Sequence, residues 1–336
     1  MKAIGYKKSL PIDNEASLED IELPDPTPGP RDLLVEVHAV SVNPVDTKVR
    51  MRAEPDEGHK VIGWDASGVV RSVGAEVTLF APGDAVFYAG ALDRPGTNSA
   101  LHVVDERIVG RKPASLDHTE AAALPLTAIT AWELLFDRLG VAENGGEGET
   151  LLIAGGAGGV GSILVQIARQ LTALTIVATA SREETTAWCR KMGAHEIVDH
   201  HGDVAGQLGS LGLSPRYIAS LTGTEQNFAA LASVLAPQGK LALIDDPDPA
   251  SIDISLLKQK AGSLHWEFMF TRSMFRTADM IEQHRLLNRV SALVDDGALV
   301  TTMRESFGTV NAANLRKAHA HQESGKAIGK SVLAGF

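Results

Sequence analysis

The sequence has a single cysteine, Cys189, among its 336 residues. One cysteine excludes an internal disulfide, and it also excludes a zinc or iron–sulfur centre held by several cysteines. Free cysteine is among the most often buried residue types, so Cys189 is expected to pack in a helix rather than to act as a nucleophile. These features favour a reducing, cytoplasmic location.

We expect no secretory signal from this sequence, and it has no excess of positive charge. The N-terminal lysines (MKAIGYKKSLPID) are not followed by the apolar core of a secretory signal, and glycines interrupt the most apolar window, which argues against a membrane span. The net charge of −11 argues against a nucleic-acid backbone or an anionic membrane as the main partner. We therefore expect a soluble protein, long enough for two domains, that acts on a small molecule.

A glycine-rich turn lies near the middle of the chain. Residues 150–154 form a short apolar, β-prone run, and the apolar residues after the turn recur at helical spacing as far as residue 171. The turn contains G-x-G-x-x-G, whose glycines permit a tight turn, close approach of a pyrophosphate, and packing of helix against strand. The predicted cofactor-binding residues of this motif are Gly156, Gly158, Gly159, Val160 and Gly161.

A lone glycine motif is weak evidence, but four further β-prone segments follow it. They are residues 175–180, 196–200, 216–221 and 239–244, each separated from the next by a polar or helix-prone stretch. Repetition of this kind indicates βα units that build a parallel sheet. The sequence therefore predicts a dinucleotide-binding Rossmann domain.

The residues before and after this region have a different pattern. Short β-prone segments at 33–40, 61–73 and 84–88 are separated by glycine and proline, which favours a barrel-like or sandwich body. Residues 262–270 predict one more strand. Residues 280–299 have helical periodicity without further βα alternation, so the C-terminal part is expected to return to the first domain.

The assembled chain resembles the medium-chain dehydrogenase/reductase superfamily, and within it the zinc-independent quinone oxidoreductase branch. The resemblance covers nearly the whole chain and depends on VNPVD at 42–46, VIGWDASGVV at 61–70, LPLTAITA at 124–131, the glycine turn, and GAHEIVD at 193–199. The C-terminal part is similar to a subgroup often labelled "zinc-binding alcohol dehydrogenase family protein". The resemblance implies an α/β fold with a doubly wound parallel Rossmann sheet in residues 126–270. It also implies a β-rich, GroES-like catalytic domain formed by residues 1–125 and 271–336.

The residues that hold the catalytic zinc of the alcohol-dehydrogenase relatives are missing. Asn43 replaces a ligand cysteine, and Trp64 replaces the ligand histidine of a G-H-E motif. The third ligand, a cysteine, has no counterpart, and residues 89–100 are too few for the four-cysteine structural zinc lobe. Because no soft ligands stand at the matching positions, we predict no metal site.

The missing ligands also favour one reaction over another. An alcohol dehydrogenase needs a Lewis acid to stabilise an alkoxide. Hydride addition to a quinone or an enone gives a delocalised anion that hydrogen-bond donors can stabilise. The predicted activity is therefore reduction of a quinone or an α,β-unsaturated carbonyl.

The end of the second predicted Rossmann strand favours NADPH as the cofactor. NAD-specific folds carry an acidic residue there, whereas this chain has Ser181 and Arg182, which suit a 2′-phosphate. The alternative is that Ser181 and Arg182 merely begin a helix in solvent. Relatives often have a lysine and a tyrosine where this chain has Thr185 and His200, so acceptance of NADH stays open.

The resemblance implies further residues at the cofactor and the substrate. Asn43 and Thr127 are expected near the nicotinamide, although Asn43 could be a turn residue and Thr127 a helix cap. The other cofactor-binding candidates are His200, Thr222, Ile244, Phe270 and Lys330.

The proton donor is open. Relatives carry a tyrosine five residues after the asparagine, and this chain has Lys48 there, which could polarise a carbonyl or simply be solvated. Tyr88, Asp46 and bound water are the alternatives, so the catalytic candidates are Asn43, Lys48 and Tyr88.

The sequence thus predicts an NADPH-dependent quinone or enone oxidoreductase, expected from the family to be a homodimer formed by edge-to-edge pairing of the Rossmann sheets. Two alternatives stay open. One is a zinc-type alcohol dehydrogenase, and the other is a non-catalytic NADPH-binding protein of the sensor or crystallin kind.

Overall fold

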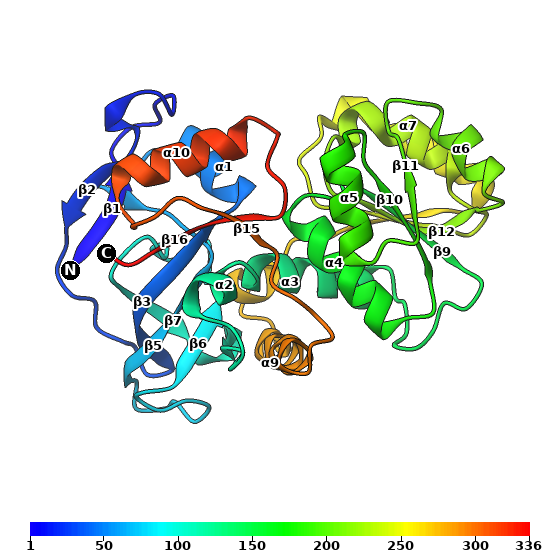
Figure 1. Ribbon diagram of the computed structural model, residues 1–336. Helices are drawn as coiled ribbons and strands as arrows, with labels where there is room; N and C mark the ends of the chain where they lie inside the picture. Colours follow the sequence, from blue (N-terminus) through cyan, green and yellow to red (C-terminus); the bar gives the residue numbers. More distant parts are fainter. The chain divides into compact units, whose positions relative to one another are not determined.

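The structure, a computed structural model, describes all residues from 1 to 336 and divides into two compact units. The first, here called the β-rich unit, consists of Met1–Ile129 and Phe270–Phe336. The second, here called the Rossmann unit, is the continuous segment Thr130–Met269. Figure 1 labels their helices and strands where there is room.

The Rossmann unit is built on a six-stranded parallel sheet with the strand order β11-β10-β9-β12-β13-β14. Its strands are β9 (Thr150–Ala154), β10 (Thr175–Thr179), β11 (Glu196–Val198), β12 (Pro215–Ser220), β13 (Lys240–Leu243) and β14 (Ser263–Trp266). Its helices are α4 (Gly159–Leu171), α5 (Glu183–Met192), α6 (Val204–Ser210) and α7 (Thr224–Val234). Short 3₁₀ helices at Pro249–Ser251 and Ile254–Lys260 and a π-helical turn at Glu133–Arg138 complete it.

The strand order is that of a doubly wound dinucleotide-binding fold. The chain places β9 in the centre, adds β10 and β11 on one side, and then returns to add β12, β13 and β14 on the other. Every residue of β9 is buried, as expected for a parallel strand covered on both faces. The predicted Rossmann domain is therefore confirmed, and the point where the strand order reverses lies between β9 and β12.

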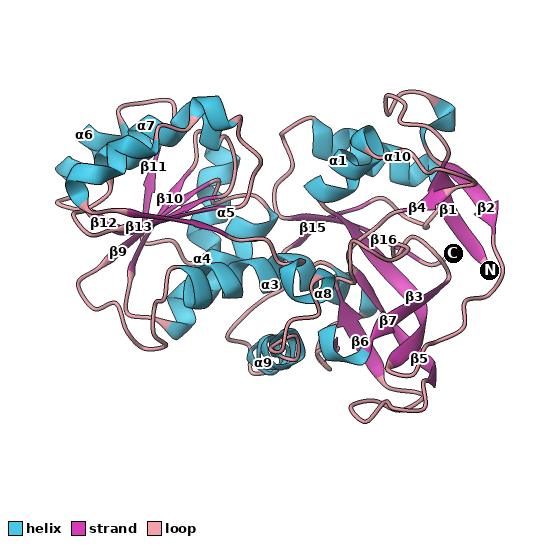
Figure 2. Cartoon of the chain, turned by 180° about the vertical axis from the view of Figure 1, so that it is seen from behind, coloured by secondary structure: helices cyan, strands magenta, loops and turns pink.

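The β-rich unit contains a seven-stranded and a three-stranded sheet (Figure 2). The larger sheet has the order β15-β16-β3-β5-β6-β8, with β7 also paired to β3, and the smaller one has the order β2-β1-β4. The strands are β1 (Lys2–Tyr6), β2 (Glu19–Glu22), β3 (Asp32–Val42), β4 (Lys60–Val61), β5 (Ala66–Val73), β6 (Ala85–Tyr88), β7 (Leu101–Asp105), β8 (Val109–Arg111), β15 (Met303–Ser306) and β16 (Lys330–Ala334).

Helices lie at the borders of these sheets. They are α1 (Pro44–Arg52), α2 (His118–Ala122), α3 (Pro125–Trp132, which continues into the Rossmann unit), α8 (Thr271–Met274), α9 (Glu282–Asp295) and α10 (Ala312–Glu323), with 3₁₀ turns at Glu15–Ser17 and Glu106–Ile108. None of the helices in the structure combines the length and the hydropathy needed to cross a bilayer.

The two ends of the chain meet in the larger sheet. Strand β16 pairs antiparallel with β3, so that Ser331 lies opposite Val42 and Ala334 lies opposite Ala39. Val42, the last residue of β3, therefore lies beside Ser331 near the start of β16, although 288 residues lie between them in the sequence.

The prediction of one strand over residues 61–73 was wrong, because this segment is two strands with a turn between them. Strand β4 ends at Val61 and β5 begins at Ala66. Gly63, between them, has a φ of 112°, and a Cβ on it would lie 2.7 Å from the side chain of Asn98. Because of this break, Trp64 and Asp65 belong to neither strand, and both side chains are buried in the interior.

Gly161 in helix α4 gives a direct test of the glycine turn. A methyl group there would lie 2.4 Å from the carbonyl oxygen of Gly155, a backbone atom that cannot move aside cheaply. We expect Gly161→Ala to destabilise the protein by about 1–3 kcal/mol through overpacking, and to weaken binding of a nicotinamide dinucleotide.

Gly209 in helix α6 is the matched control, because a Cβ on it meets nothing within 4 Å. Gly209→Ala should leave stability unchanged or raise it by up to about 1 kcal/mol, as the helix propensity of alanine implies. Chemical denaturation of both variants measures the difference, and equal stabilities would contradict the packing role of Gly161.

Candidate functional site

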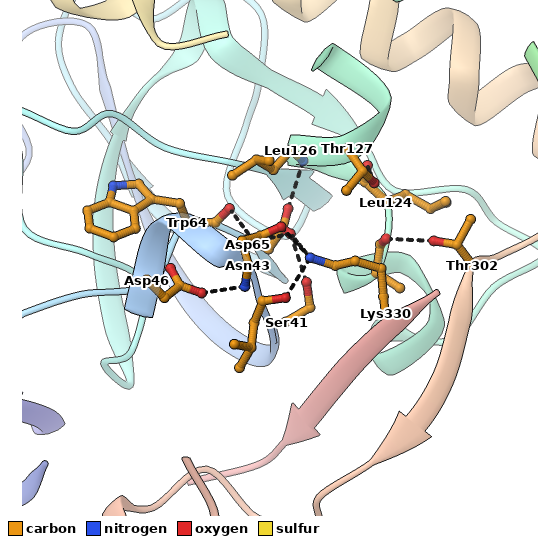
Figure 3. A network of polar contacts seen from close by, with 12 residues as sticks. Ser41, Asn43, Asp46, Trp64, Asp65, Leu124, Leu126, Thr127, Thr302 and Lys330 are labelled. Carbon is orange, nitrogen blue, oxygen red and sulfur yellow. Dashed lines mark hydrogen bonds and ion pairs between the residues drawn. The ribbon is translucent and has the colours of Figure 1, made fainter. Parts of the chain in front are cut away.

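The carboxylate of Asp65, which is fully buried, is the centre of a polar network in the β-rich unit (Figure 3). Its Oδ1 accepts a hydrogen bond from the backbone N–H of Leu126 at 2.8 Å. Its Oδ2 accepts from the Ser41 hydroxyl at 2.7 Å, the Asn43 amide at 2.8 Å and the Lys330 ammonium at 3.1 Å. One carboxylate thus joins the end of β3, the start of α3 and the start of β16.

Lys330 supplies the positive charge that balances Asp65 within this network. Its side chain is 3% exposed, and Nζ donates to the Val42 carbonyl at 2.8 Å, to Asn43 Oδ1 and to Asp65 Oδ2. An ammonium has three hydrogens to donate, and three acceptors face it here. Lys330 was expected to bind the cofactor, but the structure instead commits its ammonium to interior partners.

Asn43 is equally committed. It precedes α1 as the N-cap residue, and it is 1% exposed. Its amide donates to the Trp64 carbonyl at 3.3 Å and to Asp65, while its oxygen accepts from Lys330. An amide with both hydrogens used has none left for a substrate oxygen, so the geometry favours a positioning role for Asn43 over direct contact with substrate.

Asp46 lies in the first turn of α1 next to this network. Its carboxylate accepts a 2.6 Å hydrogen bond from the backbone N–H of Asn43, which closes a capping box. Burial raises the pKa of Asp46 to about 7 against the lowering effects of that hydrogen bond and of Lys330. Asp46 was one of the alternative proton donors, and the structure encloses it at 1% exposure.

The donor set at this place does not fit a zinc ion. Trp64 stands at the position of the relatives' histidine, and its indole donates to the Ala91 carbonyl at 3.2 Å and packs edge-on against Phe270. The remaining groups are an amide, a carboxylate and an ammonium, and the ammonium already neutralises the carboxylate. Nowhere in the structure do three or more His, Cys, Asp or Glu side chains converge as a metal site would require.

The two other catalytic candidates, Tyr88 and Lys48, and the cofactor-binding candidate Thr127 differ in accessibility. Tyr88 is fully buried and bonded to His102 at 3.2 Å, and burial raises the pKa of its phenol, so the structure gives it no open path to a substrate. Thr127 is 2% exposed and donates to the Leu124 carbonyl; it lies inside α3 and is not the helix cap that was the alternative. Lys48 is half-buried in α1 and is the most accessible of the three catalytic candidates.

In the Rossmann unit, the glycine turn joins β9 to α4 at the point where the strand order reverses. Gly155 has a φ of 89°, and its N–H donates to the Thr179 hydroxyl at 3.1 Å. Gly158 is the N-cap of α4 and is half-buried, and a Cβ on it would meet only one atom, 3.6 Å away. The turn therefore leaves the first N–H groups of α4 accessible to an anion.

The residues expected around the cofactor's ribose follow the adjacent strands. Ser181 and Arg182 are exposed after β10, and Arg182 is the N-cap of α5. His200 is exposed just after β11, and its ring contacts that of His201 at an interplanar angle of 48°. Because β9, β10 and β11 are parallel neighbours, all these residues lie at the same carboxyl edge of the sheet as the glycine turn.

Of the remaining candidates, two lie at this edge and one does not. Thr222 follows β12, and its methyl group would lie 2.8 Å from a Cβ on Gly155, so it borders the turn. Ile244 follows β13 and its N–H bonds to Ser220. Phe270 belongs to the β-rich unit, where it is 3% exposed against Trp64, so the structure does not place it in a groove of the Rossmann unit.

The sequence interpretation missed the buried network itself. Asp65 was noted only within the segment that replaces the relatives' G-H-E motif. Ser41 was not named, and Lys330 was assigned to the cofactor. A charged residue within the apolar run VIGWDASGVV was a usable signal, because buried carboxylates require a partner. The partner, however, lies 265 residues away in the sequence.

Comparison with known proteins identifies the family. Residues 29–111 match the family model described as alcohol dehydrogenase GroES-like domain, and residues 159–283 match that described as zinc-binding dehydrogenase. A zinc-type alcohol dehydrogenase-like protein of Staphylococcus aureus (strain COL) is 39% identical over 335 residues, with 99% of each chain covered. The chain therefore belongs to the medium-chain dehydrogenase/reductase superfamily, as its sequence motifs predicted.

Solved structures agree with this fold. A protein of Rhizobium etli CFN 42 that bears the name of a zinc-dependent alcohol dehydrogenase is 58% identical, with a TM-score of 0.97 and coverage of 100% of this chain and 98% of that one. The Escherichia coli quinone oxidoreductase, solved with NADPH, is 22% identical, with a TM-score of 0.84 and coverage of 99% and 100%. The names of these two proteins state different activities, and at 22% identity the second likeness shows the fold alone.

Replacement of Lys330 tests the network. Lys330→Met keeps the length of the side chain but leaves the buried Asp65 carboxylate without its cation, and we expect a loss of about 3–5 kcal/mol in the free energy of unfolding. Lys317→Met on the exposed face of α10 is the control and should change stability by less than about 0.5 kcal/mol. Urea denaturation of both variants at pH 7 makes the comparison, and equal stabilities would mean that Asp65 does not depend on Lys330.

Proposed function

We propose that this protein reduces quinones or α,β-unsaturated carbonyls with NADPH, by hydride transfer and without zinc. The observation that supports this most is the Lys330 ammonium, which binds Asn43, the residue that replaces a ligand cysteine, and Asp65, the neighbour of Trp64, which replaces a ligand histidine. This ammonium already neutralises the Asp65 carboxylate. The oxidoreductase class follows from the family, whereas the substrate, the cofactor choice and the independence from zinc are the proposal.

The chemistry of the substrate follows from the absence of suitable metal ligands. Without a Lewis acid, an alkoxide has no strong stabilisation, but an enolate or a hydroquinone anion is delocalised and needs only hydrogen-bond donors. NADPH, when bound, supplies the hydride. The likeness to the E. coli quinone oxidoreductase supports the fold alone at 22% identity, so the proposal depends on the residues of this chain.

The Rossmann unit offers the groups that would hold NADPH. The first N–H groups of α4 face the accessible side of the glycine turn and suit the pyrophosphate, while Thr222 borders the same turn. Ser181 and Arg182, at the end of β10, suit a 2′-phosphate through a hydroxyl and a guanidinium. No acidic residue stands in their place to bind the 2′-hydroxyl of NAD.

The test of the overall proposal is turnover by protein purified without added metal. We expect NADPH oxidation with 9,10-phenanthrenequinone or 1,4-benzoquinone, and zinc well below one atom per chain by elemental analysis. About one zinc per chain, with oxidation of a simple alcohol, would support the alcohol-dehydrogenase alternative. A rise in Tm with NADPH but no turnover of any acceptor would support the non-catalytic alternative.

Arg182 tests the choice of cofactor. Arg182→Ala should weaken NADPH binding by about tenfold or more, because a charge-assisted contact to the 2′-phosphate is lost, and should leave NADH binding nearly unchanged. Arg190→Ala, an exposed arginine in the last turn of α5, is the control. Fluorescence titration gives both affinities, and tighter binding of NADH than of NADPH by the unaltered protein would overturn the cofactor assignment.

Lys48 tests the source of the proton. Since Asn43, Tyr88 and Thr127 are committed to interior bonds, we propose that Lys48 or a water molecule supplies the proton or the hydrogen bond to the reduced oxygen. Lys48→Met should lower kcat/KM for a quinone by about 10²-fold if the lysine donates directly, with the affinity for NADPH unchanged. An unaltered kcat/KM would leave water as the donor.

A homodimer is also proposed, through the free edge of the Rossmann sheet. Strand β14 pairs only with β13, and Trp266 and Phe268 at this edge are 54% and 48% exposed. An unpaired edge with large apolar side chains is a surface that proteins usually cover. Sedimentation equilibrium should give twice the 35.6 kDa mass of the chain, and a monomer would contradict the proposal.

A further inference from the structure

The β-rich unit contains a cavity of about 450 Å³ that neither the polar network nor the glycine turn uses. Its apolar lining comes from Ala91, Ile108 and Met280, all nearly buried. Its charged lining consists of four arginines and three aspartates, namely Arg31, Arg94, Arg107, Arg276, Asp32, Asp93 and Asp105. An apolar floor with charged groups around it is the usual construction of a small-molecule site.

Most of these charges neutralise one another within the protein. Asp32 and Asp105 lie directly opposite each other on β3 and β7, where two like charges would repel. Arg94 forms a bidentate pair with Asp32 at 2.8 and 2.9 Å, and Arg107 forms one with Asp105 at 2.9 and 2.7 Å. These pairs leave their arginines little net charge to offer a ligand.

Arg31 is also paired, because it contacts Glu106 at 3.2 Å and Glu76 at 3.4 Å. Arg276, in contrast, is exposed and its guanidinium makes no ion pair and no hydrogen bond. The lining thus contains one uncommitted cation. Asp93, exposed on the same lining, places a negative charge near any ligand and disfavours one that carries two negative charges.

The backbone of Arg276 is the second, independent observation. Helix α8 ends in a Schellman motif, in which the N–H of Thr277 bonds to the Arg272 carbonyl and the N–H of Arg276 bonds to the Ser273 carbonyl. The position that Arg276 occupies in this motif is left-handed, with a φ of 46°, and glycine is its usual occupant. A large side chain is therefore held here against the local backbone preference, which is a feature of functional positions.

From this combination we infer that the cavity binds a small organic monoanion, a carboxylate with an apolar body, through Arg276. The carboxylate pairs with the uncommitted guanidinium, and the apolar body covers Ala91, Ile108 and Met280. The single available cation and the nearby Asp93 select one negative charge over two. All the lining residues belong to the β-rich unit, so this site does not depend on the cofactor or on the proposed reaction.

The test is a fluorescence titration of the full-length protein with 1-anilinonaphthalene-8-sulfonate, an aromatic monoanion, in saturating NADP⁺ so that the nucleotide site is occupied. The unaltered protein should show saturable binding. Arg276→Gln should weaken it by about tenfold or more through loss of a charged contact. The control Arg285→Gln, which removes an exposed arginine on α9 paired only with Glu282, should not change it.

Two further measurements separate a ligand contact from a structural role and from general apolar adsorption. Arg276→Gly should abolish the charge-dependent binding while Tm stays the same or rises, because glycine adopts the left-handed backbone without strain. The neutral analogue N-phenyl-1-naphthylamine should bind the unaltered protein and Arg276→Gln equally. Phenylacetate should displace the probe at lower concentration than phenyl phosphate does.

The inference is overturned by any of three results. Arg276→Gln could bind the probe within twofold of the unaltered protein. Arg276→Gly could lower Tm, which would make the side chain structural. Phenyl phosphate could displace the probe more strongly than phenylacetate, which would contradict the selection for a single negative charge.

Discussion

The negative charge of Asp65 in a dry interior is the constraint on which the β-rich unit depends. Removing a carboxylate from water costs several kcal/mol unless a cation and hydrogen-bond donors compensate it. Lys330 provides the cation, and Ser41, Asn43 and the backbone of Leu126 provide the donors. These contacts join α1, α3 and β16 to the end of β3, in addition to the backbone pairing of β16 with β3.

The same network is the basis on which we propose that the reaction does not use zinc. Asn43 and Lys330 donate all their side-chain hydrogens to interior partners, so neither has one left to donate to a cofactor or a substrate. The proposed reaction therefore uses Lys48 on α1 or a water molecule as the proton source. A site that holds its own ammonium is suited to reactions whose intermediates are already delocalised, and it offers little to a localised alkoxide.

Local patterns were sufficient for the Rossmann unit and insufficient for the network. Each buried strand, the glycine turn and each helix of this unit has its own local sequence pattern. Strands β9 to β13 could therefore be predicted from periodicity. The break between β4 and β5 at Gly63 could not be predicted in this way, because it involves close packing of Gly63 against Asn98, which is distant in the sequence. Lys330 was named as a candidate from the sequence, but its contact with Asp65 could not be predicted. The left-handed backbone of Arg276 could not be predicted from composition or from the spacing of residues.

The pairing of β16 with β3 determines the order in which the two units can complete their folding during synthesis. The Rossmann unit is one continuous segment and has all its strands once residue 269 has left the ribosome. Asp65 is made early and its partner Lys330 lies 265 residues later, so the buried ion pair cannot form until synthesis is nearly finished. A chain that ends a few residues before Lys330 should therefore still fold its Rossmann unit. Its β-rich unit should be more susceptible to proteolysis.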